Sequence, residues 1–122
     1  MNYYERQLRQ AERFLQWVKE EGGREGATHL RTLFSKQQVA RMNWLKKNVQ
    51  GTILEVGCNW SCVLAWVSHS PRAAVSGHMG VDVGEGNIAL AQAVSPEFQF
   101  RTANAISLPF EDRSFDTVML PE

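Results

Sequence analysis

The sequence predicts an α/β protein in which two N-terminal helices precede a parallel sheet whose strands alternate with helices. Apolar residues in the first 50 positions recur at the spacing of helix faces. From Gly51 onward, short β-prone runs alternate with short helical segments, an order that is typical of right-handed βαβ units. The 122 residues are enough to form one hydrophobic core.

The first 50 residues are predicted to form a cap of two helices. The first helix has one apolar stripe and ends at Gly22-Gly23. The second begins with Thr28 as its N-cap and runs to about Asn48. Both apolar faces are interpreted as packing surfaces, and a lid over a ligand site is compatible with the same pattern. The stripe of the first helix consists of Tyr4, Leu8, Ala11, Leu15 and Val18, with Phe14 beside it.

Residues 51–122 are predicted to form the α/β core. The run Thr52–Val56 is almost continuously β-prone, as in a strand that is buried on both faces. The predicted strands and helices are, in order, the strand Thr52–Val56, the helix Cys62–Val67, the strand Ser76–Val83, the helix Asn87–Val94, and the strands Phe98–Thr102 and Phe115–Leu120.

Composition and charge exclude several classes of protein. Residues 1–50 hold ten basic and five acidic residues (+5), and residues 51–122 hold three and eight (−5), so the net charge is zero. The positive charge of residues 1–50 is too dilute to indicate a nucleic-acid partner. No apolar run is long enough for a membrane span, and the N-terminus does not resemble a signal peptide, so we expect a cytoplasmic protein. Cys58 and Cys62 are expected to be free thiols, without a metal site.

Three segments place chemically useful residues at the carboxyl ends of the predicted strands, where ligands bind in open parallel sheets. Glu55 and Gly57 end the first strand, and a glycine there lets the backbone approach a ligand closely. Asp82 ends the second strand, where its carboxylate can accept hydrogen bonds from two ribose hydroxyls. Asn104 follows the third strand, where its amide can bind an adenine edge while Ile106 lies against the ring.

Each of these positions also has a purely structural interpretation. The segment from Glu55 to Gly57 is compatible with an ordinary strand-to-helix turn. Asp82 is compatible with a helix N-cap or a loop aspartate, and Asn104 with an Asx-turn. The residues alone leave these alternatives open.

Three blocks of the sequence resemble the class I S-adenosylmethionine-dependent methyltransferases, especially the small-molecule branch with the ubiquinone- and menaquinone-type enzymes. The blocks are Ile53–Cys58, Gly80–Val83 and Asn104–Val118. The third is the most specific, because it contains the string LPFEDRSFDTV running into a strand. The resemblance implies a Rossmann-like sheet with strand order 3-2-1-4, S-adenosylmethionine as the cofactor and a small-molecule methyl acceptor. Residues 51–122 would then be the cofactor-binding part of the core.

The resemblance also implies which residues bind the cofactor. Glu55 and Gly57 would shape the floor of the methionine and ribose site, Asp82 would bind the ribose hydroxyls, and Val83 would pack on the adenine. The remaining contacts would be Cys58 and Asn59 near the methionine, Asn104 and the Ala105 amide at the adenine edge, and Leu120 and Pro121 beside the sulfonium.

The sequence departs from the family pattern at two places. Asn59 and Ser61 replace two motif glycines. We expect Asn59 to be left-handed, Ser61 to cap the next helix, and Trp60 to flank the cofactor or close part of the pocket. The family core has seven strands, and this chain stops just past the fourth. We therefore expect either a truncated piece of a longer protein or a bare strand edge that another chain covers, as in a homo-oligomer.

Three functions are compatible with these patterns. The first is methyl transfer to a small molecule, by this chain or by a protein of which it is the cofactor-binding portion. The alternative is a non-catalytic S-adenosylmethionine-binding or assembly module with a degenerate methyltransferase fold. A nicotinamide-dependent oxidoreductase is disfavoured because G-x-G-x-x-G is absent. We assign no catalytic residue, since His29, His69 and His78 belong to no motif.

Overall fold

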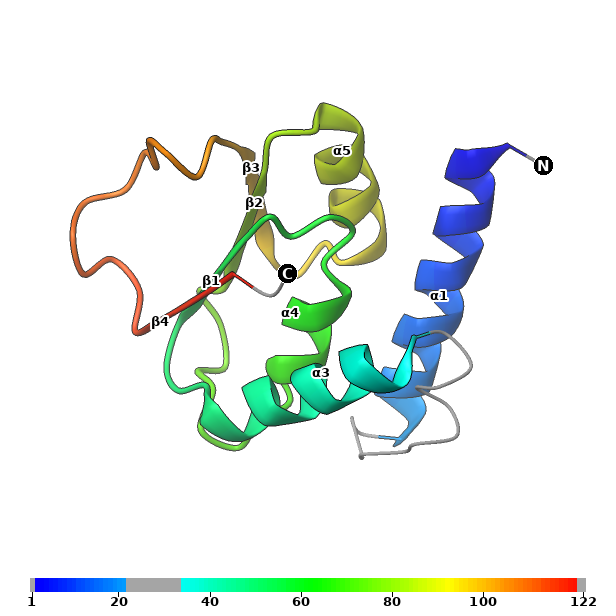
Figure 1. Ribbon diagram of the computed structural model, residues 1–122, viewed down its shortest axis with the longest axis horizontal. Helices are drawn as coiled ribbons and strands as arrows, with labels where there is room; N and C mark the ends of the chain where they lie inside the picture. Colours follow the sequence, from blue (N-terminus) through cyan, green and yellow to red (C-terminus); the bar gives the residue numbers. More distant parts are fainter. Residues whose placement is uncertain (1, 22–33, 121–122) are drawn as a thin grey trace.

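The computed structural model describes residues 2–21 and 34–120, and it places helices against one side of a small sheet (Figure 1). The N-terminal helices are α1 (Tyr3–Glu21) and α3 (Lys36–Asn48). The described core elements are β1 (Ile53–Val56), α4 (Cys62–Val67), β2 (Met79–Asp82), α5 (Glu85–Val94), β3 (Gln99–Thr102) and β4 (Thr117–Met119). Within the two described ranges, no helix combines the length and the apolar character needed to cross a bilayer.

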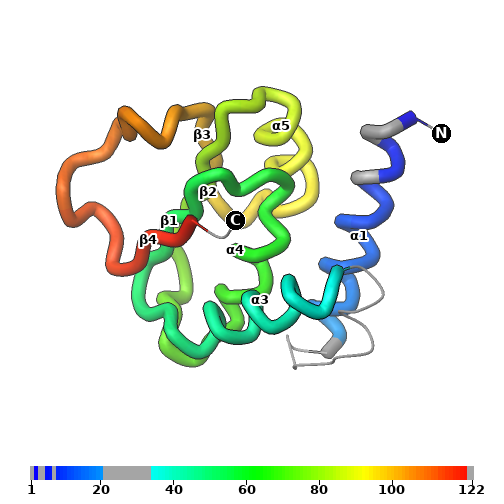
Figure 2. Tube along the Cα trace, viewed as in Figure 1, coloured from blue at the N-terminus to red at the C-terminus, as the bar shows by residue number. Residues whose placement is uncertain are grey.

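The described strands form one parallel sheet in the order β3-β2-β1-β4, which confirms the predicted fold class and strand order. Glu55 of β1 lies opposite Gly80 of β2 and Met119 of β4. Figure 2 follows the chain from β1 through α4 to β2, and from there through α5 to β3. Because all pairs are parallel, the carboxyl ends of the strands meet at one edge of the sheet.

β1 lies between two apolar clusters, one on each face of the sheet. All four of its residues are buried, as the continuous β-prone run predicts. Ile53 faces the helices and belongs to the cluster that they form. Leu54, Val56 and Val81 belong to the other cluster, which apolar side chains of the segment 103–115 cover. Figure 1 shows the chain between β3 and β4 on the side of the sheet opposite the helices.

Aromatic side chains join α1 to the core. Phe14 is fully buried and meets the Trp60 ring edge-on, with ring centroids 5.8 Å apart. Trp17 stacks on Trp66 of α4, with centroids 5.4 Å apart. Contacts of this kind contribute roughly 0.5–1.5 kcal/mol each beyond the burial of area. Leu8, Ala11, Leu15 and Val18 of the predicted stripe also pack in or against this core, so this part of the stripe is a packing surface.

The second predicted helix begins later than expected, at Lys36. The Ser35 hydroxyl accepts a hydrogen bond from the Gln38 N–H (3.2 Å), and the Gln38 side chain accepts one from the Ser35 N–H (2.9 Å). This capping box fixes the start of α3, because Ser35 is extended (ψ 162°). A continuous helix up to Asn48 from the predicted cap Thr28 is therefore wrong. Thr28 itself and the glycines predicted to end the first helix lie outside the described residues.

The SFDT part of the most specific sequence block joins the starts of β1 and β4. The Asp116 carboxylate accepts hydrogen bonds from the Thr52 N–H (2.8 Å) and hydroxyl (3.1 Å). These bonds hold the pKa of Asp116 below its usual range. The Thr117 hydroxyl donates to the Gln50 carbonyl at 2.6 Å. Gly51 leaves room for the carboxylate, which a Cβ at that position would overlap.

Ser61 begins α4 in a left-handed conformation (φ 67°). Its hydroxyl is buried and has no hydrogen-bond partner among the described residues, so the predicted side-chain cap is wrong. The reason is geometric, because a capping residue normally has an extended backbone. Asn59 is also left-handed (φ 52°), as predicted for a residue type that tolerates this conformation.

Replacing Ser61 with glycine should raise the free energy of unfolding by about 1–2 kcal/mol, because glycine adopts the left-handed conformation without a Cβ clash. Ser61→Ala removes only the unpaired hydroxyl and should give a smaller gain. Urea denaturation of both variants and the wild type measures the difference. Equal stability of the two variants would contradict the assignment of strain to the Ser61 backbone.

Candidate functional site

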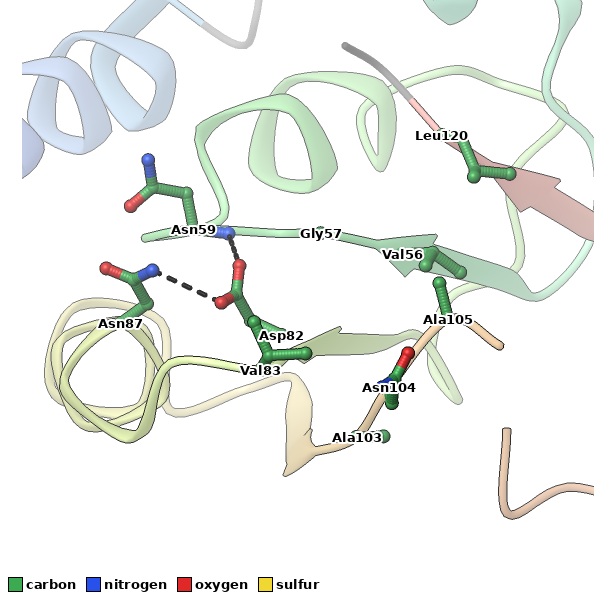
Figure 3. Close-up of a pocket in the computed structure, with 10 residues that line it drawn as sticks. All are labelled: Val56, Gly57, Asn59, Asp82, Val83, Asn87, Ala103, Asn104, Ala105 and Leu120. Carbon is green, nitrogen blue, oxygen red and sulfur yellow. Dashed lines mark hydrogen bonds between the residues drawn. The ribbon is translucent and has the colours of Figure 1, made fainter. Parts of the chain in front are cut away.

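A cleft of about 650 Å³ opens at the carboxyl ends of the strands (Figure 3). This volume lies within the range that small-molecule sites occupy. The cleft is bordered by the loops that follow β1, β2 and β3, and Leu120 lies at the end opposite Asn87. The lining residues are Val56, Gly57, Asn59, Asp82, Val83, Asn87, Ala103, Asn104, Ala105 and Leu120.

Asp82, the last residue of β2, connects two of these loops. Its Oδ2 accepts a hydrogen bond from the Asn59 N–H (3.0 Å). Its Oδ1 accepts hydrogen bonds from the Gly84 N–H (2.8 Å) and from the Asn87 side-chain amide (3.2 Å). Figure 3 shows the bonds from Asn59, in the loop after β1, and from Asn87, on α5, converging on the carboxylate. A carboxylate has about four acceptor positions, so Asp82 holds the loops and keeps capacity for a ligand.

The backbone turns at Gly57 (φ 74°) directly after β1. The N–H groups of Gly57 and Cys58 both donate to the Val81 carbonyl, at 2.8 and 2.9 Å, and hold the turn against β2. A Cβ on Gly57 would stand in open space. Glycine is therefore required here by its backbone conformation and not by crowding.

The loop after β3 supplies the third wall of the cleft. The Asn104 Oδ1 accepts a hydrogen bond from the Ile106 N–H at 3.0 Å, which is the Asx-turn of the structural interpretation. In the described part of the chain the Ala105 N–H has no hydrogen-bond partner. The loop therefore presents a backbone donor and an exposed side-chain amide beside Val83, whose side chain is 68% exposed.

Several predicted site residues do not line the cleft. Glu55 and Cys58 are buried, with the Cys58 sulfur beside Gly80. Ile106 is 93% exposed and borders a separate hollow, which Leu54 of β1 and Val118 of β4 also line. Pro121 lies outside the described residues. The binding roles given to these residues, like those of the lining residues, stay predictions.

Trp60 does not border the cleft, contrary to expectation. Its side chain is 5% exposed and packs in the helix-side core against Phe14. The left-handed residues on either side of it, Asn59 and Ser61, reverse the chain and direct the indole away from the cleft. The residues that replace the glycine pattern thus place Trp60 where it anchors α1, and Trp60 does not fill the ligand site.

Three lining residues were missed by the sequence analysis. Val56 is the last residue of β1, and only its position between the predicted site residues Glu55 and Gly57 could have indicated it. Asn87 lies in the first turn of α5, five positions after Asp82, where an amide can reach the preceding strand end. Ala103 has no distinguishing side-chain chemistry, so only the fold reveals it.

Glu55 is an ionisable group in an apolar environment. It is 1% exposed, and its Oε1 accepts a hydrogen bond from the Leu64 N–H at 3.3 Å. Burial raises the pKa of Glu55 to about 8; the Leu64 bond opposes this, and the Asp82 charge adds to it. Glu55 is therefore mostly protonated at neutral pH.

The nearby thiols and histidine do not provide a reactive group. Burial, reinforced by the Glu55 charge, raises the pKa of Cys58 and of Cys62, and both are free thiols as predicted. The His78 Nδ1 accepts from the Ile53 N–H at 3.1 Å, and its Nε2 lies 2.8 Å from a backbone carbonyl, so this ring is structural. Across residues 2–21 and 34–120, no group of three or more His, Cys, Asp and Glu side chains could hold a metal ion.

The open parallel α/β sheet has a cleft at its carboxyl edge, which is where ligands bind in proteins of this fold class. The profile of a family described as "Methyltransferase domain" matches residues 54–122, and the chain belongs to this family. No curated protein matches the sequence.

Solved structures share the fold at low identity. The YcgJ protein from Bacillus subtilis is 24% identical with a TM-score of 0.54, and the match covers 65% of this chain and 36% of YcgJ. The cyclase SpnF is 24% identical (TM-score 0.54, 70% of this chain and 35% of SpnF). The plantazolicin methyltransferase BpumL, in complex with S-adenosylhomocysteine (SAH), is 13% identical (TM-score 0.54, 98% and 50%). The chain thus spans half or less of each structure, and one fold carries different chemistries.

The stability of the protein should fall as pH rises from about 5 to about 8, because the folded state holds the Glu55 proton over this range and the unfolded state does not. The expected loss is on the order of 1.4 kcal/mol for each pH unit in that window. Glu55→Gln should flatten the profile, whereas Glu12→Gln, at an exposed acid of α1, should leave it unchanged. Urea denaturation at several pH values measures this, and a Glu55→Gln profile parallel to the wild type would refute the assignment.

Proposed function

We propose that the cleft binds S-adenosylmethionine and that this chain is the cofactor-binding part of a methyltransferase acting on a small molecule, in the cytoplasm. The observation that carries the proposal is the convergence of Gly57, Asp82 and Asn104 on one cleft in a chain of the methyltransferase family. SAH is bound in BpumL, which has the same fold. Membership of the small-molecule branch with the ubiquinone- and menaquinone-type enzymes, which the sequence resembles, is the finer form of this proposal, and it assigns no methyl acceptor.

The residues that line the cleft fit the chemistry of this cofactor. The Asp82 carboxylate would accept hydrogen bonds from ribose hydroxyls, and the exposed Val83 side chain would pack on the adenine. The Asn104 amide and the unpaired Ala105 N–H supply donors at the adenine edge. Gly57 leaves open space where the chain turns, and Leu120 adds an apolar wall at the far end.

The protein's contribution to methyl transfer would be alignment and exclusion of water. When bound, the cofactor supplies a methyl group activated by a sulfonium. The loops held by Asp82 would fix the orientation of the cofactor for in-line displacement. Holding the two reactants in this geometry is the source of the rate gain that positioning gives. We assign no general base, because the cleft lining contains no histidine and the acceptor decides whether one is needed. In this proposal residues 1–50 form a helical cap on the core.

A non-catalytic assembly module with the same cofactor site is the second candidate. Val118 and Leu120, at and beside β4, are 53% and 68% exposed, and among the described strands β4 pairs only with β1. Such an edge can pair with a second copy of the chain. Light scattering together with a turnover assay separates the two functions. An oligomer without turnover favours assembly, and a monomer with turnover excludes it.

Isothermal calorimetry with SAH tests the proposal. Asp82→Ala should weaken binding at least tenfold, because each charge-assisted hydrogen bond to the carboxylate contributes roughly 1.5–3 kcal/mol. Asp112→Ala removes an equal charge from an exposed position outside the cleft and should bind like the wild type. No binding by the wild type, or equal loss in both variants, would sink the proposal.

A further inference from the structure

Glu55 is a buried acid beside the cleft that the proposed binding contacts do not use. Its neighbours in the chain, Val56 and Gly57, line the cleft, and so does Asp82, whose charge acts on it. Its Oε1 accepts one hydrogen bond, from the Leu64 N–H at 3.3 Å. A buried carboxyl with a single backbone donor is poorly compensated if it ionises.

The titratable groups that face Glu55 carry a negative charge or none. β2 contributes Asp82, the loop after β1 contributes Cys58, and α4 contributes Cys62. β4 (Thr117–Met119), on the other side of β1, has no titratable side chain. In the described part of the chain, no lysine, arginine or histidine acts on Glu55. A positive charge that favours the carboxylate would therefore have to come from a ligand.

We propose that Glu55 is a specificity-determining residue that gives up its proton to solvent when a cationic ligand occupies the cleft. The protein would thereby prefer the sulfonium cofactor to the neutral thioether that remains after methyl transfer. This inference rests on the proposed function, since it takes S-adenosylmethionine and SAH as the two ligands. The two ligands differ in the positive charge at sulfur and share their other groups, so this charge is what Glu55 would distinguish.

The direction of the pH dependence follows from the protonation of the empty protein. Burial raises the pKa of Glu55 to about 8, so the proton is present at neutral pH. A nearby sulfonium lowers that pKa, which links cofactor binding to proton release. The preference for the sulfonium therefore rises with pH and becomes constant above about pH 8, where the carboxylate already exists in the empty protein. At low pH Glu55 stays neutral in both complexes and does not discriminate.

Calorimetric titration with S-adenosylmethionine and with SAH, from about pH 6 to about pH 8.5, tests this residue. The ratio of the two affinities should rise about tenfold in the wild type, which corresponds to one unit of pKa change on binding. Glu55→Gln should keep a constant ratio, and Glu97→Gln, at an exposed acid outside the cleft, should behave like the wild type. Since the amino group of each ligand titrates in the same range, the difference between wild type and Glu55→Gln carries the result.

Proton release by the wild type alone provides a second test, which does not depend on the folding of a variant. At neutral pH, binding enthalpies in two buffers of different ionisation enthalpy should show proton release with S-adenosylmethionine in excess of that with SAH. Equal release with both ligands, or a wild-type affinity ratio that is constant with pH, would overturn the inference. If neither ligand binds at any pH, the proposed function itself fails. If both bind with a constant ratio, only the role of Glu55 fails.

Discussion

The Asp82 carboxylate holds together the part of this protein on which the cleft depends. It accepts hydrogen bonds from the Asn59 N–H, the Gly84 N–H and the Asn87 side chain, so one side chain fixes the loops after β1 and β2. Those loops supply Gly57, Asn59 and Val83 to the lining of the cleft. A residue placed in this way has a structural role and a ligand-facing role at once, because its hydrogen bonds leave an acceptor position unused.

Contacts outside the cleft also keep these loops in place. The Gly57 and Cys58 N–H groups hold the turn to the Val81 carbonyl, and the buried Trp60 ties the same loop to α1. Asp116 joins the start of β1 to the start of β4, far from the cleft. The sheet therefore positions its carboxyl edge through contacts at both ends of β1. The burial of Glu55, which raises its pKa to about 8, leaves a protonated carboxyl next to the site at neutral pH.

The fold was predictable from the sequence because its signals are local and repeated. Alternating strand and helix patterns, with the acid at Asp82 and the string ending at Val118, were enough to predict the parallel sheet and, through the family resemblance, its strand order. The start of α3 was mispredicted because the capping box at Ser35 interrupts an apolar pattern that reads as continuous. A pattern of apolar residues reports a buried face and says little about where the backbone leaves the helix.

The site was predictable only in part, for a different reason. The residues after each strand could be assigned because parallel strands bring their carboxyl ends together. Whether a side chain faces the cleft depends on backbone angles that the sequence does not display. The left-handed residues Asn59 and Ser61 direct Trp60 into the core, and the Asx-turn at Asn104 leaves Ile106 on the outside. Burial of Glu55 and the contribution of Asn87 likewise depend on tertiary packing.

Amide chemical-shift mapping by NMR during titration with SAH can show whether the cleft around Asp82 is the ligand site. If it is, the largest shifts should occur at Gly57, Asn59, Gly84 and Ala105, around the cleft, with little change along the exposed face of α1. Shifts concentrated on α1, or on the hollow beside Ile106, with the Asn59 and Gly84 amides unchanged, would contradict it.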